Sequence, residues 1–190
     1  MTQPQTSLLR LDSRALQVLA HPLRSRLLTA LRMDGPATAT ALAATLATNT
    51  GATSYHLRRL ASVDLVEETG EGRGRERWWR AATEMHGWTE RDVADDPDGR
   101  AASDWLRRHY LRSFIDRYEA WLDDQGSWPL DWQDSAGASD YALHVSPARL
   151  AAFNDEFSAL VERYRRGTGD PDEETVQVHL HAFPLGASRR

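Results

Sequence analysis

The sequence contains no cysteine, and its 23 basic residues are all arginine, with no lysine. Without cysteine the chain can form no disulfide, no thiolate metal site and no catalytic thiol. No run of about 18 apolar residues is present, which excludes a membrane-spanning helix of ordinary length. The first residues lack a basic start followed by an apolar stretch, so no secretory signal is predicted. These absences predict a cytoplasmic protein.

The common catalytic motifs are also missing from the sequence. There is no glycine-rich phosphate loop, no nucleophile elbow and no HExxH pattern. Carboxylates are frequent in the second half, but nothing in the sequence groups two of them into an acid–base pair. We therefore expect a protein that is not an enzyme and needs no cofactor. An enzyme built on the second half remains the weakest alternative.

Charge is distributed unevenly along the chain. The apolar content of 41% predicts an ordinary core, and the formal net charge is −5. The first 85 residues hold 11 arginines against 8 acidic residues, whereas the rest hold 12 against 20. A mildly basic half thus precedes a strongly acidic one. The overall negative charge does not argue against nucleic-acid binding by the first half, since the distribution matters more than the sum.

The first half predicts four helices followed by a β-hairpin. Asp12 or Ser13 can cap the first helix, and Pro22 suits the first turn of the second. In the last segment the apolar period changes to about two, around a tip with Gly70, Gly72 and Gly74. The predicted helices are 13–21, 22–33, 38–48 and 51–60, and the hairpin is 63–82.

The fourth predicted helix, with the sequence GATSYHLRRL, has two different faces. At 100° per residue, one side is mostly apolar and can pack on a core. The opposite side carries hydrogen-bonding groups, and His56 lies at the border, where packing is as good an explanation as base contact. The apolar side holds Thr53, Leu57, Leu60 and Ala61, and the polar side holds Gly51, Ser54, Tyr55, Arg58, Arg59 and Ser62.

This two-faced helix fits the requirements of a DNA-recognition helix. A helix enters the major groove of DNA with its outer side chains at base edges while its inner face packs. Arg58 could contact a guanine or a phosphate, and Ser54 and Tyr55 could donate to phosphates or bases. In the hairpin, glycines allow close approach to a narrow groove, with Arg73 and Arg75 at the tip. The order of elements predicts a winged helix-turn-helix domain over residues 11–82.

Three stretches of this region resemble the ArsR-type winged helix-turn-helix family of bacterial transcriptional regulators: LAHPLRSRLLTAL, ATATALAATLATNTGATSYHLRRLASVDLVEE and GRGRERWWRA. The resemblance implies a homodimer on a pseudo-palindromic operator, usually acting as a repressor. By position, it implies DNA contacts from four residues of the recognition helix and two of the wing. They are Ser54, Tyr55, His56 and Arg58, followed by Arg73 and Arg75. Arg59 is added because it lies on the polar side of the same helix.

The sequence departs from this family in two ways. Many members sense metal through cysteines on the helix before the recognition helix, but here that helix, TATALAATLAT, holds no Cys, His, Asp or Glu. Metal sensing at that position is therefore excluded. The chain beyond residue 100 is an addition to the minimal pattern, similar to C-terminal extensions on some larger regulators of this type.

The second half predicts a linker, a long helix and a strand–helix–strand unit. The polar stretch 83–99 is the linker, and 100–124 has apolar residues at helical spacing. A tryptophan-containing loop follows, then a strand at 141–145, a helix from Pro147, and a strand at 175–183. Isolated strands are marginal, so we expect these two to pair with each other or with strands of a second copy. The fold class is thus mainly α with small β, and residues 100–184 form a C-terminal dimerisation or effector domain.

Aromatic residues and histidines of the second half leave alternatives open. The tryptophans could line a pocket for an apolar effector, although packing of the long helix in a dimer is the favoured explanation. They are Trp105, Trp121, Trp128 and Trp132. His179 and His181, with His144, could bind a metal, but solvated histidines are the commoner outcome. Trp78 and Trp79 are adjacent on a strand, so one of them should enter the core.

A function of a different class competes with DNA binding. The winged helix could be a protein-interaction module that does not bind DNA, with the acidic half contacting a basic partner. The two hypotheses differ in how the arginines of the recognition helix and wing are used. A continuous basic surface favours DNA, whereas ion pairs with Glu67, Glu68 or Glu71 favour the interaction module.

Overall fold

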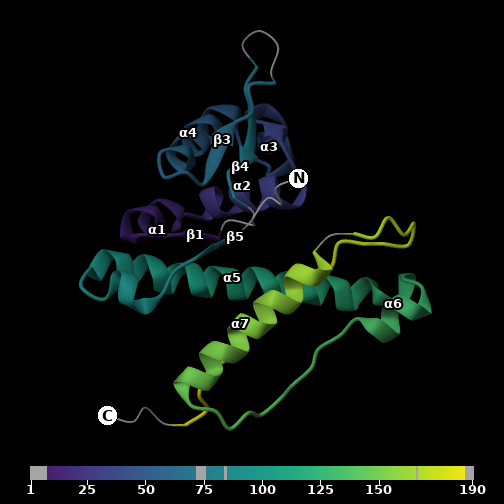
Figure 1. Ribbon diagram of the computed structural model, residues 1–190. Coiled ribbons are helices and arrows are strands. Elements are labelled where there is room, and N and C mark those ends of the chain that lie inside the picture. The colour runs from purple at the N-terminus through teal and green to yellow at the C-terminus, as the bar shows by residue number, and fades with distance from the viewer. Residues whose placement is uncertain (1–7, 72–75, 84, 166, 187–190) are drawn as a thin grey trace, which may run out of the picture. The chain divides into compact units, whose positions relative to one another are not determined.

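The computed structural model describes residues 8–71, 76–83, 85–165 and 167–186. The chain divides into two compact units, Met1–Asp116 and Arg117–Arg190, which are called the N-terminal and C-terminal units below. Helices dominate and the strands are few and short, which confirms the predicted fold class (Figure 1). None of the described helices is long and apolar enough to cross a membrane.

The N-terminal unit contains the predicted four helices in order, followed by a hairpin, with β1 before them and β2 between the second and third. The side chain of Asp12 accepts a hydrogen bond from the Ala15 N–H at 2.8 Å and caps the first helix. Pro22 occupies the first turn of the second helix, as expected. The elements are β1 Leu8–Arg10, α1 Ser13–Leu19, α2 Pro22–Met33, β2 Ala37–Thr38, α3 Ala39–Thr45, α4 Thr50–Ala61, β3 Val66–Glu68, β4 Trp78–Ala81, β5 Met85–Gly87, η1 Glu90–Val93 and the first part of α5 Pro97–Asp124.

Two small sheets hold this unit together. β4 lies in the middle of the first sheet and pairs antiparallel with β3 and with β2. Trp79 of β4 is buried and Trp78 only partly so, which confirms that one of the two tryptophans enters the core. The second sheet was not predicted. In it, β1 pairs in parallel with β5. The stretch 83–99 that the sequence indicated as linker therefore contains β5, as well as η1 and the start of α5.

A single leucine-rich core joins the helices of the N-terminal unit. Full burial of a leucine contributes about 1.5–3 kcal/mol, so this cluster dominates the stability of the unit. Val93 of η1 and Leu106 of α5 belong to the same cluster, so the start of the long helix packs on the winged helix. The most deeply buried side chains of this cluster are Leu11, Leu16, Leu19, Leu27, Leu28, Leu57, Leu60, Leu65, Leu106, Val66 and Val93.

A buried polar seam crosses the N-terminal unit from α2 to α5. The Arg32 guanidinium donates to the Thr83 carbonyl oxygen at 3.1 Å, and its Nη1 lies 2.5 Å from His86 Nδ1. Because arginine cannot accept a hydrogen bond, Nδ1 must be the acceptor and the histidine proton sits on Nε2. His86 Nε2 then donates to the Tyr110 hydroxyl at 3.1 Å. This chain of bonds requires a neutral His86.

Burial sets the protonation states of this seam. Burial, followed by the nearby Arg32 charge, lowers the pKa of His86 to about 3. Burial also raises the pKa of Tyr110 to about 12, so its hydroxyl keeps its proton at neutral pH. At neutral pH the seam therefore carries the positive charge of Arg32 alone.

The C-terminal unit contains the rest of α5, η2 Gln125–Ser127, α6 Leu130–Ser135 and α7 Pro147–Tyr164. The helix predicted from Pro147 is confirmed, with Ser146 accepting a hydrogen bond from the Arg149 N–H. The predicted loop after α5 instead contains η2 and α6, both of which are too short for helical periodicity to be visible.

The two strands predicted on either side of α7 need correction. Residues 141–145 and 175–183 follow α6 and α7, but neither segment belongs to a sheet among the described residues. Alternating apolar residues favour an extended backbone, but a strand also requires a hydrogen-bonded neighbour. The alternation alone could not supply that neighbour.

The seam gives a testable pH dependence of stability. Unfolded histidine has a pKa near 6.5, whereas folded His86 titrates at about 3. Between these values the unfolded chain binds a proton that the folded chain does not. Protonation of His86 in the unfolded chain therefore lowers the free energy of unfolding progressively as pH falls from 6.5 towards 3. Above pH 6.5 the ring is neutral in both states and this loss is absent. We expect the free energy of unfolding to fall by about 1.4 kcal/mol more per pH unit, between pH 6 and 4, than in a variant without this group.

Urea titrations at several pH values measure this difference. His86→Asn removes the titrating ring while keeping an acceptor for Arg32, and His144→Asn, at an exposed position, is the control. Parallel pH profiles for wild type and His86→Asn would contradict the account. A free energy of unfolding that depends less steeply on pH in His86→Asn, but not in His144→Asn, would support it.

Candidate nucleic-acid interface

The helix–turn–helix at α3 and α4 is fixed by caps at both helix starts. Thr38 accepts a hydrogen bond from the Ala41 N–H at 3.1 Å, and Asn49 accepts one from the Ala52 N–H at 2.8 Å. Such caps satisfy donors that a helix start leaves free. Between the helices, Ala47 has a φ of 51°, in the left-handed region. The turn is therefore short and conformationally restricted.

The inner face of α4 packs as the sequence predicts. Thr53, Leu57 and Leu60 are fully buried, and the Thr53 hydroxyl donates to the Asn49 carbonyl oxygen at 3.0 Å. That bond satisfies the only polar group on the buried face. The packing of these side chains fixes the rotation of α4 about its axis. It consequently determines which residues face outwards.

The outer face of α4 presents most of the side chains expected for DNA contact. Tyr55 is 53% exposed, and Arg58 and Arg59 are exposed. Ser54 and His56 are partly buried. The structure thus brings all five predicted residues of α4 onto or beside one surface, with His56 at its border.

His56 connects α4 to the start of α2. Its ring lies 4.5 Å from the His21 ring, centroid to centroid, and 5.1 Å from the Tyr55 ring. Arg24 Nη1 lies 3.5 Å from His56 Nδ1, while the Arg24 Nε donates to the Val18 carbonyl oxygen. Arg24 therefore ties the end of α1 to α4. We call His21, Arg24, Tyr55, His56 and Arg59 the histidine–arginine cluster.

This cluster is short of negative charge. Burial is the main cause that lowers the pKa of both His21 and His56, and the Arg24 charge lowers both further. Burial, and then repulsion from Arg59, lowers the pKa of Arg24 as well. Positive groups held together without a carboxylate favour an anionic ligand.

The sequence did not indicate His21 and Arg24 as part of this surface. Their contacts with α4 come from a helix some thirty positions earlier, beyond the range of helical periodicity. The one available signal was the HPLR stretch. There, the His21 ring accepts a hydrogen bond from the Leu23 N–H at 3.2 Å, which orients it at the start of α2.

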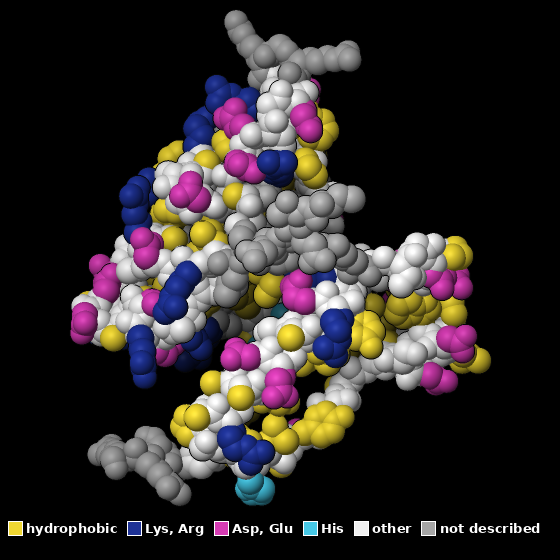
Figure 2. Space-filling view, in the orientation of Figure 1, with side chains coloured by type: hydrophobic (Ala, Val, Ile, Leu, Met, Phe, Trp, Pro, Cys, Tyr) yellow, Lys and Arg dark blue, Asp and Glu magenta, His cyan; other side chains and the backbone are white. Residues whose placement is uncertain are grey.

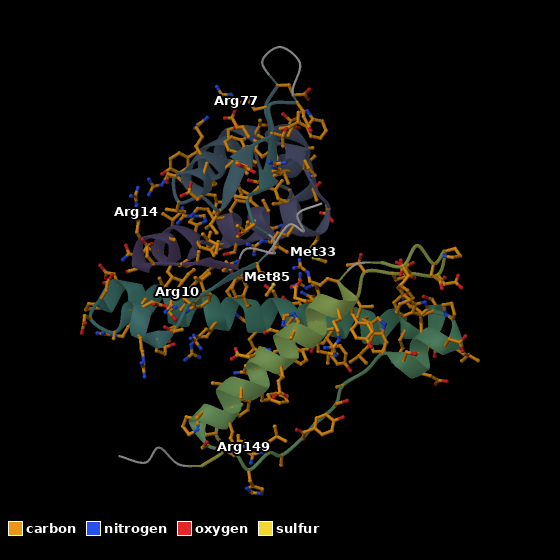
Figure 3. The ribbon with its side chains drawn as sticks, in the orientation of Figure 1. Arg10, Arg14, Met33, Arg77, Met85 and Arg149 are labelled. Carbon is orange, nitrogen blue, oxygen red and sulfur yellow. The ribbon has the colours of Figure 1, made fainter. Side chains whose placement is uncertain are left out.

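Two glutamates of β3 form ion pairs with arginines that lie outside the recognition helix. Glu67 binds Arg80 at 2.8 Å and Glu68 binds Arg77 at 2.7 Å. Among the described residues, no carboxylate forms an ion pair with Arg24, Arg58 or Arg59. Figure 2 shows dark-blue arginine side chains along the flank that carries α4 and α1. Arg14 projects from the same flank in Figure 3.

The wing is described only up to its strands. β3 and β4 pair antiparallel, with Val66 opposite Ala81 and Glu68 opposite Trp79. Arg73 and Arg75, expected to contact DNA from the tip, lie outside the described residues. Their role stays a prediction from the sequence.

The aromatic residues expected to line an effector pocket are divided between the units. Trp105 stacks on His109 in the N-terminal unit, with ring centroids 4.7 Å apart. In the C-terminal unit, Trp121 stacks on Tyr118 at 5.7 Å, and Trp128 meets Trp132 edge to face at 6.0 Å. The structure therefore brings Trp128 and Trp132 together.

The histidines considered as metal ligands are placed in the C-terminal unit. The rings of His179 and His181 are 5.8 Å apart, centroid to centroid, and His144 is exposed. Within the described ranges, no three or more His, Cys, Asp or Glu residues are arranged to hold a metal ion.

Comparison with protein families now adds to this geometry. Residues 19–69, which run from the end of α1 through β3, match the family model of a helix-turn-helix domain. The chain contains a helix-turn-helix domain. In this domain α3 and α4 are the two helices of the motif, and α2 packs on α4. No similar sequence was found among curated proteins.

Two solved structures are similar to the chain. One, described as "Crystal structure of Possible transcriptional regulator for arsenical resistance", is 32% identical, over 58% of this chain and 95% of its own, with a TM-score of 0.33. The other, RV1404 from Mycobacterium tuberculosis, is 16% identical, over 81% of this chain and 84% of its own, with a TM-score of 0.32. TM-scores this low do not establish a shared overall fold. The helix-turn-helix domain supports a DNA-binding transcriptional regulator.

The turn of the helix-turn-helix domain gives a prediction about stability. A left-handed backbone costs a non-glycine residue about 1 kcal/mol, and glycine removes this cost at Ala47, whose φ is 51°. We expect Ala47→Gly to raise the free energy of unfolding by about 0.5 kcal/mol, because glycine also increases the entropy of the unfolded chain. Ala44→Gly, at an exposed position inside α3, should lower it by about 1 kcal/mol. Urea denaturation measures both, and equal destabilisation would contradict the account of the turn.

Proposed function

We propose that this protein is a sequence-specific transcriptional regulator that binds a pseudo-palindromic operator as a homodimer and acts as a repressor. The observation that supports this most strongly is the outer surface of α4. It carries Arg58, Arg59 and the neighbouring Arg24 with no ion pair to a described carboxylate. The exposed guanidinium groups of Arg58 and Arg59 suit phosphates and guanine edges, whereas Arg24 also donates to the Val18 carbonyl oxygen.

The roles of individual residues follow from their positions on this surface. Arg58 and Tyr55 are on the exposed face of α4 and would contact base edges or phosphates in the major groove. Ser54 and His56 are at its borders, where contacts to the DNA backbone are expected. Arg73 and Arg75 of the wing would add charge at an adjacent groove. The acidic second half would face away from DNA and limit non-specific binding.

Dimerisation through the long helix is part of the proposal. Leu111 and Ile115 are one helical turn apart on α5 and are 42% and 41% exposed. Apolar side chains at this spacing form a stripe suited to a partner helix. An effector site remains a proposal only within the C-terminal unit, at Trp128 and Trp132, whose rings meet edge to face.

The competing function is an interaction module that does not bind DNA. Ion pairs that occupy the arginines of the wing favour this alternative, since Arg77 and Arg80 are paired with glutamates. The arginines of α4 are not paired in this way among the described residues. The surface of α4 therefore favours DNA.

Fluorescence anisotropy against the DNA upstream of the protein's own gene, over a salt series, tests the proposal. Removing a base contact should weaken binding by about 1–3 kcal/mol and relax sequence preference, so Arg58→Ala should lower affinity roughly tenfold to a hundredfold. Arg73→Ala/Arg75→Ala should reduce the salt slope by about one for each phosphate that these arginines neutralise in the wild type. Arg149→Ala, in the C-terminal unit, is the control for removal of one positive charge. Absence of binding to that DNA and to a random pool at low salt would overturn the proposal.

The histidine–arginine cluster predicts that DNA binding strengthens as pH falls. In the free protein, burial lowers the pKa of His21 and His56, so both rings are neutral at pH 7. Neighbouring phosphates would raise these values, and the complex would then take up protons. Each unit of increase in pKa contributes up to about tenfold in affinity at low pH. We expect affinity to rise between pH 8 and 6, and to rise less in His56→Gln.

The same anisotropy assay measures this pH dependence at constant ionic strength. His144→Gln, far from the helix-turn-helix domain in sequence, serves as the control and should behave as wild type. If His56→Gln retains the full pH dependence of wild type, His56 does not take up a proton on binding.

A further inference from the structure

The C-terminal unit has no core of its own. None of its described residues, 117–165 and 167–186, is buried, whereas the N-terminal unit holds a large leucine cluster. Burial of apolar surface is the main favourable contribution to folding. A unit that buries none of its side chains fully has little to offset the loss of chain entropy. Another surface must therefore cover its apolar side chains.

The exposed apolar side chains include two alternating sets. In the first extended segment, 141–145, they are Tyr141, Leu143 and Val145, with 79%, 53% and 38% of their surface exposed. In the second, 175–183, Val176, Val178 and Leu180 are 61%, 63% and 40% exposed. Residues at i, i+2 and i+4 of an extended chain lie on one face. Each segment thus presents an apolar face typical of a strand, outside any described sheet.

The second extended segment also lacks the usual protection of a sheet edge. Its sequence, TVQVHLHAF, contains no Asp, Glu, Lys, Arg or Pro. Natural proteins place charges, prolines or bulges on open edges to prevent pairing with other chains. A nine-residue uncharged stretch rich in β-branched residues has the opposite character. Such a segment is expected to be paired in the working molecule.

The chemistry of the segment selects a second copy as the partner. DNA is unsuitable because the stretch carries no formal positive charge for phosphates. A strongly charged protein surface is equally unsuitable, because its charges would lose water without gaining partners. A neutral, alternating strand fits best, and an identical segment has that character. In a twofold arrangement the same contact serves both copies at once.

We propose that residues 175–183 form an antiparallel β-ladder with the same residues of a second copy, and that this ladder completes the C-terminal unit. The inference rests on the homodimer of the proposed function and names the contact that joins its C-terminal units. The first extended segment, 141–145, is then available to extend the intermolecular sheet at its edge. The apolar faces of both segments become covered by the second copy.

The absence of cysteine allows a direct test by single-cysteine scanning of the full chain. In an antiparallel ladder about a twofold axis, moving two residues from the axis separates equivalent Cα atoms by about 13 Å, beyond the reach of a disulfide. Because residues 175–183 pair with themselves, the twofold axis passes at His179. Val176→Cys, His179→Cys and Leu180→Cys are compared with Leu185→Cys, which is 85% exposed and outside the segment. We expect His179→Cys, at the axis, to form disulfide-linked dimers at least about tenfold faster than the control under mild oxidation, and Val176→Cys to stay close to the control rate.

Equal cross-linking at all four positions would overturn the proposal, as would no cross-linking above the control. Amide hydrogen exchange of wild type gives a second measurement. Protection of 175–183 should increase with protein concentration, and protection that is independent of concentration would show pairing within one chain. If the protein does not bind the operator but cross-linking is still fastest at the axis position, only the proposed regulator is contradicted. If the protein binds the operator but no position cross-links faster than the control, only the ladder is contradicted.

Discussion

The organisation of the N-terminal unit depends on one constraint, which is that α4 must pack on its inner side while its outer side stays available. Burial of Leu57 and Leu60 fixes the rotation of this helix, and the Thr53 hydroxyl is satisfied by the carbonyl of Asn49. Once that rotation is fixed, Tyr55, Arg58 and Arg59 can only face outwards. The packing of a hydrophobic core thereby determines which charged groups are presented, and the surface needs no separate mechanism to position it.

The surroundings of α4 extend this positioning to other elements. Arg24 reaches from α2 towards His56 and binds the carbonyl of Val18 at the end of α1. Further along α2, Arg32 is linked by hydrogen bonds through His86 to Tyr110 of α5. α2 thus contacts both the candidate DNA surface and the long helix through hydrogen-bonded arginines. A buried network of this kind specifies one arrangement of helices, because each of its groups loses a partner in any other arrangement.

The two units use their apolar residues in different ways. The N-terminal unit buries leucines from α1, α2, α4 and α5 in one cluster. In the C-terminal unit, by contrast, apolar side chains such as Leu130 and Val178 remain largely exposed. A chain that is well packed in one half and open in the other is typical of a protein that completes its fold by association. This difference is why we propose assembly for the C-terminal unit, whereas the proposal of DNA recognition rests on the outer surface of α4.

Much of the N-terminal unit could be predicted from the sequence because its signals are local. Pro22 marks the start of α2, and the spacing of Thr53, Leu57 and Leu60 identifies the buried face of α4. Contacts between distant segments could not be predicted in this way. The approach of His21 to His56 and the pairing of β1 with β5 depend on tertiary packing and leave no periodic signal. The alternation of 175–183 predicted a strand, but it contains no information about a hydrogen-bonded neighbour, and no described sheet includes the segment. α6 is too short for any period to be visible.

The most direct test of the central claim is amide hydrogen exchange of the full-length protein with and without its upstream DNA. We expect slower exchange in α4 and in the first turn of α2, around His21 and Arg24, when DNA is bound. Exchange in α7 of the C-terminal unit should stay unchanged at constant protein concentration. Slower exchange confined to the C-terminal unit, with α4 unaffected, would contradict the assignment of α4 as the surface that recognises DNA.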